Sequence, residues 1–596
     1  MKRCPECRRD YYDDTLLYCL DDGNALLEGP ASVDEPATAI LSEPGAVATG
    51  FPVSESPTRA QINTTDQTAI LRTGSEAEPQ DSLGNQPERQ SLSAHLAAEP
   101  QGKVGSRQRQ LAVVGIAVVV LIAGFLGYRY FVPTKQIESI AVMPFVNESG
   151  NADVEYLSDG MTETLISSLS QLPNLNVKGR SSVFRYKGKD VDTKTLGKEL
   201  GVQAVLYGRV IQRGDQLTLS LELLDAVTEN VIWSGKYDRK QADLVSLQSE
   251  IVRDVSNKLK TKLSGADVAK VEKRYTANPE AYRLYLQGRF NWNKRTAEGL
   301  SNAAEFYRGA IDKDPGFALA YAGLADTYVI TGAYGTISPS EAMPQAKAAA
   351  LKAIELDSSL AEPRAALGVY YAGYGWDFER GMRELRRATE LNPDYATAWH
   401  WLGNGLPILG KNEEAITAAK RAEEIDPLSP IISADTGFDL ILLRRYDDAI
   451  EQARHTFSID PNFWYAHYIM GVAYDLKGMH AEAVAELRRS VELNPDTVTR
   501  GRLATALARS GQGAEAQSLL NDLVRNSANR YTQGYYLATA QLALGDKDAA
   551  FASLDRDLHE RGIYMQWLAI NPEFDRLRDD PRFAEMVKKM GSMKLQ

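Results

Sequence analysis

A regular series of prolines in the C-terminal half limits the fold most strongly. Each one follows an aspartate or asparagine that ends an apolar helical pattern, and the members are Pro315, Pro393, Pro427, Pro461 and Pro495. The last four are evenly spaced, at the period of about 34 residues that is typical of a helix–turn–helix repeat. Such repeats bury their apolar faces only by stacking on neighbours, and the stack presents an extended concave surface rather than a reaction pocket. The period therefore predicts an all-α superhelix over residues 278–596 that binds other proteins.

Short motifs within this period identify the repeat. The segments WHWLG (399–403) and MGVAY (470–474) place glycine where the two helices of a pair would touch. They resemble the W-x2-L-G-x2-Y pattern of the tetratricopeptide repeat (TPR) family, and about eight helix pairs fit the array. The ending, residues 567–583, is expected to form a capping helix, and one longer repeat places an extra loop at 331–340.

If the array binds as related repeats do, first-helix side chains on the concave surface recognise an extended peptide or protein ligand. The consensus register selects Arg289, Asp326, His400, Asn404 and Tyr468. The amide of Asn404 can donate and accept hydrogen bonds together, which suits the unpaired backbone of a peptide. The alternative is a solvated face with no ligand. The histidines of the array fall in separate repeats and predict no metal or catalytic cluster.

Residues 137–264 alternate helix and strand patterns and predict an α/β domain. The expected strands lie at 140–145, 175–178, 204–211, 217–224 and 231–237, and the expected helices at 156–172, 193–200 and 244–263.

Four blocks of this domain resemble the TolB-like domain family, namely residues 139–150, 155–189, 197–210 and 223–239. The resemblance implies a domain often found beside TPRs, attached in relatives to cyclase, kinase or winged-helix modules, with no common chemical activity. None of those modules is visible in this sequence. Asp159, Arg180 and Arg185 are candidates for lining a ligand cleft, and the alternative is that they cap helices and anchor loops.

The chain lacks the sequence signatures of common enzymes. It has no G-x-x-x-x-G-K-[ST] loop, no kinase glycine-rich loop with a following HRD and no HExxH, and residues 137–264 contain no histidine. The commonest general base is therefore missing from that domain. We predict no catalytic residues and a protein that is not an enzyme, with a cryptic site in the TolB-like domain as the alternative. The net charge of −12 disfavours a dedicated nucleic-acid binder.

All three cysteines lie close to the N-terminus, between Cys4 and Cys19. A C-x2-C pair, a later cysteine and a following aspartate suit one tetrahedral zinc ion, and zinc binding would fold a segment too short to build a core. Residues 1–28 are thus predicted to form a zinc-ribbon-like module with structural Zn²⁺, similar to the small modules that begin many bacterial membrane-anchored regulators. The alternative is three incidental cytosolic thiols. The expected ligands are Cys4, Cys7, Cys19 and Asp22, with Asp21 as the second choice for the oxygen ligand.

A linker and an apolar segment follow. Residues 29–110 are rich in proline, serine, threonine and glutamine and predict a disordered linker. Residues 111–128 carry no charge, and the apolar run continues to 132, long enough for a transmembrane helix. Basic residues at 103, 107 and 109 precede this run and favour a cytoplasmic N-terminus.

These features together predict a multidomain bacterial protein that crosses the inner (cytoplasmic) membrane once. The TolB-like and TPR parts would lie outside the cytoplasm and act as a non-enzymatic scaffold or regulator of a protein complex. The alternative is a signalling or transcription-associated regulator whose soluble parts lie in the cytosol, where they engage a kinase or transcription factor.

Overall fold

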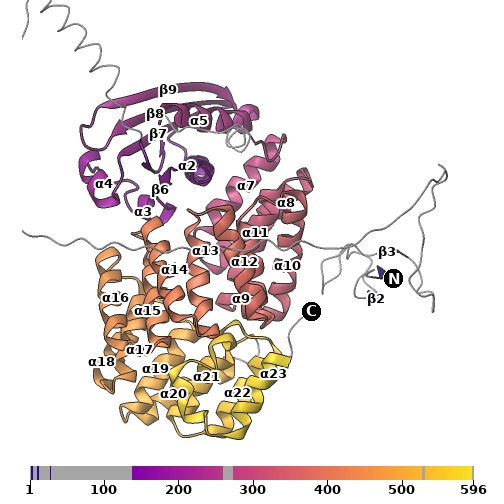
Figure 1. Cartoon of the computed structure of the whole chain (residues 1–596), viewed down its shortest axis with the longest axis vertical. Coiled ribbons are helices and arrows are strands. Elements are labelled where there is room, and N and C mark those ends of the chain that lie inside the picture. Colours follow the sequence, from indigo (N-terminus) through magenta and orange to yellow (C-terminus); the bar gives the residue numbers. More distant parts are fainter. Residues whose placement is uncertain are drawn as a thin grey trace, which may run out of the picture. The chain divides into compact units, whose positions relative to one another are not determined.

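The computed structural model describes the sheet domain and the repeat array expected from the sequence (Figure 1). The described residues are 2–3, 10–11, 27–28, 137–172, 174–259, 273–526 and 531–592. The expected zinc ligands, the linker and the apolar segment 111–132 lie outside these ranges, so they stay predictions. Within the described ranges, no helix has the length and hydropathy that a bilayer span requires.

Three two-residue strands are described near the N-terminus. The first, β1 (Lys2–Arg3), pairs antiparallel with β2 (Asp10–Tyr11) and with β3 (Leu27–Glu28), so β1 is central in the order β2-β1-β3.

A mixed sheet forms the centre of the domain that begins at residue 137. Its order is β6-β4-β7-β8-β9, parallel from β6 to β7 and antiparallel from β7 to β9, and β5 also pairs with β7. Alternate leucines of β8, from Leu217 to Leu223, are buried, so one face of the sheet packs against helices. The strands are β4 (Ser139–Val142), β5 (Val146–Asn147), β6 (Asn176–Val177), β7 (Ala204–Arg213), β8 (Gln216–Asp225) and β9 (Val231–Lys240).

Four helices accompany this sheet: α2 (Glu155–Ser170), α3 (Arg180–Phe184), α4 (Thr193–Leu200) and α5 (Leu244–Lys258). Both ends of helix α4 carry residues that are typical of helix ends. Its N-cap Asp192 accepts a hydrogen bond from the Thr195 amide, and Gly201 ends it with φ +63°. The longer strands and helices agree with the sequence-based expectation, whereas β5 and α3 are too short for a periodic pattern to predict.

Eight helix pairs follow in the described part of the chain, the number expected from the repeat period. First helices of successive pairs contact one another, and together they form what we call the first-helix face. The first helices are α7 (Pro279–Trp292), α9 (Ala318–Tyr334), α11 (Glu362–Val369), α13 (Ala396–Gly405), α15 (Pro430–Leu442), α17 (Trp464–Leu476), α19 (Thr497–Arg509) and α21 (Gly534–Ala543). The second helices are α8 (Ala297–Lys313), α10 (Pro339–Leu356), α12 (Phe378–Leu391), α14 (Asn412–Ile425), α16 (Tyr446–Ile459), α18 (His480–Leu493), α20 (Gly513–Asn526) and α22 (Lys547–His559).

Small residues set the distance between the helices of a pair. A β-carbon on Gly368 of α11 would lie 2.5 Å from Leu385 Cγ of α12, and one on Gly471 of α17 would lie 2.6 Å from Leu487 Cγ of α18. A larger side chain at either position would push the two helices apart. Glycine thus has the packing role that the repeat motif predicts.

The chain after α22 is irregular before it ends in a helix. Two short 3₁₀ turns, η5 (Ile563–Trp567) and η6 (Pro572–Leu577), precede α23 (Pro581–Ser592). The capping helix predicted over 567–583 is therefore wrong in its bounds, since the helix begins only at Pro581. Proline cannot donate the backbone hydrogen bond that a helix interior needs, which explains the breaks at Pro572 and Pro581.

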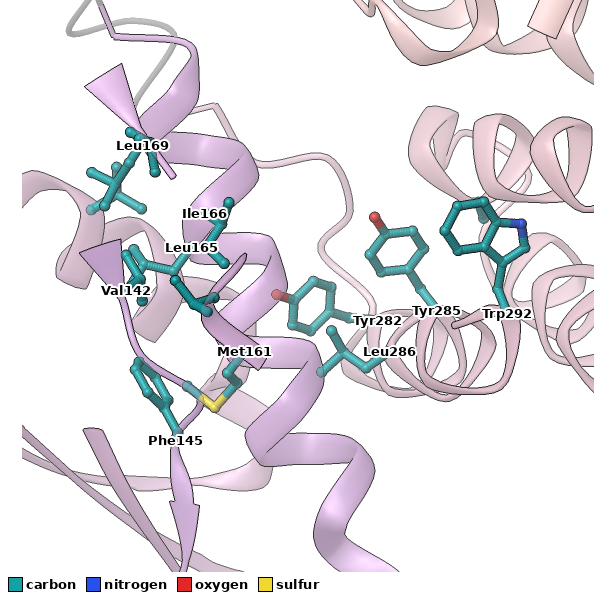
Figure 2. Packing of buried hydrophobic residues seen from close by; sticks show 14 of the residues in the cluster. Val142, Phe145, Met161, Leu165, Ile166, Leu169, Tyr282, Tyr285, Leu286 and Trp292 are labelled. Atoms are coloured by element: carbon teal, nitrogen blue, oxygen red, sulfur yellow. The ribbon is translucent and has the colours of Figure 1, made fainter. Parts of the chain in front are cut away.

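The sheet domain and the start of the array share one hydrophobic core. Figure 2 shows Tyr282 and Leu286 of α7 beside Met161 of α2, and all three are buried. A β-carbon on Gly160 would lie only 3.0 Å from Leu286 side-chain atoms. Helix α7 therefore serves both as the first repeat helix and as a wall of the sheet domain's core.

Candidate protein-binding surface

Arg289, the first of the predicted recognition residues, already has a partner within the chain. Its guanidinium pairs with Glu163 of α2, and Asn293 Nδ2 donates to Glu163 Oε2 at 2.7 Å. Burial alone would raise the pKa of Glu163, but Arg289 and Arg180 hold it below its ordinary value. At this end the first-helix face thus receives a side chain from the sheet domain.

Asp326 of α9 is 2% exposed, and its Oδ1 has no hydrogen-bond partner in the described part of the chain. Burial raises the pKa of this carboxyl to about 7, while Arg289 opposes the rise. The predicted residue is therefore on the first-helix side of the array but sits too deep to form an open recognition surface.

Two predicted residues of α13 pair with the next first helix. His400 Nε2 lies 2.6 Å from Asp435 Oδ2, and Asn404 Nδ2 donates to Asp439 Oδ1 at 3.0 Å. Burial raises the pKa of Asp439 well above its ordinary value. These side chains connect neighbouring repeats, so their polar groups are already used within the array.

Tyr468 of α17 is also used within the array. Its hydroxyl accepts a hydrogen bond from Arg502 Nε of α19 at 3.1 Å, and both residues are buried. Four of the predicted positions therefore face neighbouring parts of the array, Arg289 pairs with the sheet domain, and none of the five is openly exposed.

A segment that follows α22 lies across the first-helix face. We call residues 561–578, which contain η5 and η6, the C-terminal segment. Trp567 Nε1 donates to the Asn404 carbonyl at 3.0 Å, and the Trp567 ring lies edge-on to Phe438 with centroids 5.1 Å apart. Arg561 donates to the Tyr374 carbonyl at 3.2 Å. The segment thus crosses α15, the end of α13 and the π-helical turn η3 (Tyr370–Tyr374) that follows α11.

Two ion pairs hold the other half of the C-terminal segment. Glu573 pairs with Arg502, and these side chains are only 1% and 2% exposed. Arg444, just after α15, donates to both carboxylate oxygens of Asp575 at 2.6 and 2.8 Å. Four apolar side chains of the segment are fully buried, namely Met565, Leu568, Phe574 and Leu577.

A second contact joins the sheet domain to the array through Asp426, the residue after α14. Its carboxylate accepts from the Ser182 amide at 2.7 Å, from Ser182 Oγ at 2.5 Å and from the Ser181 amide at 3.3 Å. Burial raises the pKa of Asp426, and the serine donors oppose the rise. A β-carbon on Gly179 would clash with the Asp426 side chain, so glycine is needed at this approach. The contact has no signal in the sequence, because the Asp-Pro pair at 426–427 indicates only a helix end.

The candidate ligand residues of the sheet domain serve as anchors. Asp159 pairs with Lys187, the Arg180 guanidinium lies 3.8 Å from the Phe184 ring centroid, and Arg185 lies over Tyr186. The cavity lined by residues of α2, α5 and α7 has a volume of about 10 Å³, which is room for one water. No group of three or more metal-ligating side chains occurs among the described residues.

Comparison with known proteins also separates the sheet domain from the repeat array. A family model described as "HilA/YgeH-like transcriptional regulator, second domain" matches residues 135–254, and two tetratricopeptide repeat models match 370–430 and 465–497. The TPR assignment is thereby shown. The sheet domain is similar to the HilA-like domain, and its TolB-like resemblance stays a prediction.

Two curated relatives align with parts of the chain. A Rhizobium meliloti protein named "Putative adenylate cyclase 3" is 35% identical over 187 residues, which are 31% of this chain and 32% of that protein. The transcriptional regulator HilA of Salmonella typhimurium is 21% identical over 322 residues, which are 54% of this chain and 56% of HilA. The alignments therefore span about a third and just over half of these relatives.

Among solved structures, YrrB, a TPR protein described as having an unusual peptide-binding site, is 23% identical with a TM-score of 0.23 over 33% of this chain and 96% of its own. Pseudomonas aeruginosa PilF is 20% identical with a TM-score of 0.29, over 40% of this chain and 98% of its own. By the family models, parts of the chain are similar to TPR proteins and to the second domain of HilA-like regulators.

Proposed function

We propose that this protein is a non-enzymatic regulator that binds a protein partner through the first-helix face of its TPR array. The observation that carries the proposal is the C-terminal segment. An irregular stretch of this chain lies on that face, held by a hydrogen bond to a backbone carbonyl, an aromatic contact and ion pairs. Bound peptides are recognised by the same kinds of contact.

Transcription-associated regulation is the setting that the comparisons favour. The HilA-like match covers the sheet domain, and the HilA alignment spans 322 residues, more than that domain contains. The net charge of −12 argues against direct DNA binding, so the proposal places the regulator on a protein partner. The cyclase-named relative aligns over only 32% of its own length, so no cyclase activity is carried over.

Site-specific photo-crosslinking in the native host tests the proposal. A photoreactive residue replaces Tyr334, which is 45% exposed at the end of α9, and in a matched protein it replaces Glu451 of the second helix α16, whose side chain is 68% exposed. A partner that crosslinks at 334 and not at 451 supports the proposal. Equal crosslinking at both positions, or none at 334, contradicts it.

Membrane anchoring and zinc binding remain part of the proposal through residues 111–132 and the cysteine-containing module. The cysteines all lie between Cys4 and Cys19, so Val227→Cys, at a position 69% exposed, gives a single thiol in the sheet domain. A membrane-impermeant maleimide added to intact cells, with any outer membrane permeabilised, should label it before lysis if the domain lies outside the inner membrane. Labelling only after lysis would favour the cytosolic alternative, and zinc content of the purified full chain tests the metal separately.

A further inference from the structure

The C-terminal segment has the character of a bound peptide rather than of another repeat. Between α22 and α23 it forms only the two short turns η5 and η6, whose backbone hydrogen bonds stay within single turns. Its position on the array is set by the side-chain contacts described above. The segment also reaches repeats far from its own, since Trp567 bonds to a residue 163 positions earlier.

Apolar anchors hold its first half. A β-carbon on Gly373, in the turn η3 that follows α11, would lie 3.1 Å from Ile563 Cγ2, and one on Gly332 of α9 would lie 3.8 Å from Ile563 Cδ1. Glycine at these positions leaves room for the isoleucine. Trp567 then packs on Phe438 of α15. The first-helix face thus accepts an aliphatic and an aromatic side chain four residues apart.

Acidic anchors hold its second half. Glu573 is the carboxylate that pairs with buried Arg502, and within the described ranges no other carboxylate pairs with that arginine. The neighbouring Arg509 lies 2.5 Å from Asp475 and 3.7 Å from Glu573, so its closer partner is Asp475. Removing the segment would leave a buried cation uncompensated, which is strongly unfavourable. Any replacement must therefore bring an anion to Arg502.

We propose that the first-helix face from α9 to α19 is a binding surface for an aromatic and acidic peptide segment, and that residues 563–577 are its resident ligand. A partner with the same chemistry, an aromatic side chain for Phe438 and a carboxylate for Arg502, displaces this segment. The inference rests on the proposed function, because it names the chemistry of the partner that the array binds.

Exchange of the segment in the folded full chain tests the inference without a partner. A protease recognition sequence is inserted between Glu560 and Arg561 and cleaved after folding, and a fluorescent peptide of residues 561–596 is added. We expect the labelled peptide to exchange into the cleaved protein and unlabelled peptide to compete. The Glu573→Gln peptide should compete at least about tenfold more weakly, and the Glu585→Gln peptide, altered at an exposed carboxylate of α23, should compete as well as the parent.

A second measurement keeps the backbone intact. The uncleaved wild-type chain should exclude the labelled peptide, whereas the uncleaved Glu573→Gln chain should bind it, because its own segment is held less tightly. Loss of the fold on cleavage, absence of exchange over days, or equal competition by the Glu573→Gln peptide would show that the segment is permanent core and overturn the inference. Exchange without any crosslinked partner would instead contradict the proposed function alone.

Discussion

The two ends of the TPR array use the same kind of ion pair in different surroundings. At the N-terminal end Arg289 of α7 pairs with Glu163 of the sheet domain, with side chains 18% and 9% exposed. At the other end Arg502 of α19 pairs with Glu573 of the C-terminal segment, with side chains 2% and 1% exposed. In both places a first-helix arginine receives a glutamate from an element outside the repeats.

The surroundings differ in burial and in the groups around each glutamate. Glu163 also accepts from Asn293 at 2.7 Å and lies 3.5 Å from Arg180, whereas Glu573 lies 3.7 Å from a second arginine, Arg509, which pairs more closely with Asp475. The N-terminal contact is thus one part of a broad apolar interface, while the C-terminal contact is a deeply buried group of charges. This difference suggests that the sheet domain is a fixed neighbour of the array and the C-terminal segment an exchangeable one.

The largest expected effect comes from removing each arginine. Arg502→Ala leaves buried Glu573 with only the more distant Arg509, 3.7 Å away, as a counter-charge and should lower the free energy of unfolding by about 3–5 kcal/mol. Arg289→Ala should cost about 1–3 kcal/mol, because Arg180 and Asn293 still compensate Glu163. Urea unfolding of the purified variants measures both values.

Arg454→Ala provides the control for this comparison. Its side chain on α16 is 55% exposed and pairs within its own helix, so the cost should stay below about 1 kcal/mol. If Arg502→Ala and Arg289→Ala lowered the free energy of unfolding equally, the two ends of the array would not differ in this respect.

Aspartates at equivalent repeat positions sharpen the comparison. Asp426 and Asp460 both precede a repeat proline, in successive repeats, but only Asp426 accepts hydrogen bonds from the sheet domain. Asp426→Ala leaves the buried Ser182 donors unpaired and should lower the free energy of unfolding by about 2–3 kcal/mol. Asp460→Ala should lower it by about 1 kcal/mol. Protease digestion between the domain and the array should also become faster for Asp426→Ala alone. Equal stability of the two variants would mean that the sheet domain gains nothing from Asp426.

The number of repeats could be predicted because its signal is local. Proline spacing and glycines such as Gly471 report contacts inside one helix pair, and the eight pairs followed from them. The occupancy of the first-helix face could not be predicted, because Arg289 meets a residue 126 positions away and the Asn404 backbone meets one 163 positions away. A repeat pattern describes which side chains face inward, but it contains no information about the non-repeat elements that reach them.

The smallest effect concerns a carboxylate that the array leaves without a hydrogen bond. Asp435 and Asp439 have partners on α13, whereas Asp326 Oδ1 has none in the described ranges. Burial raises the pKa of Asp326 from its ordinary value of 3.8 to about 7. Between these two pH values the Asp326 carboxyl keeps its proton in the folded chain and loses it in the unfolded chain. Stability therefore falls as the pH rises toward 7.

Asp326→Asn removes this penalty, because the amide stays neutral. The stability advantage of the variant over wild type should widen by about 2 kcal/mol between pH 5 and pH 8, as measured by urea unfolding at both values. A constant difference across that range would mean that Asp326 is solvated or paired in the folded protein. A widening difference would establish that a buried carboxyl near Arg289 keeps its proton in the folded chain. The N-terminal end of the array would then hold a neutral buried carboxyl, whereas the C-terminal end holds the charged pair of Arg502 and Glu573.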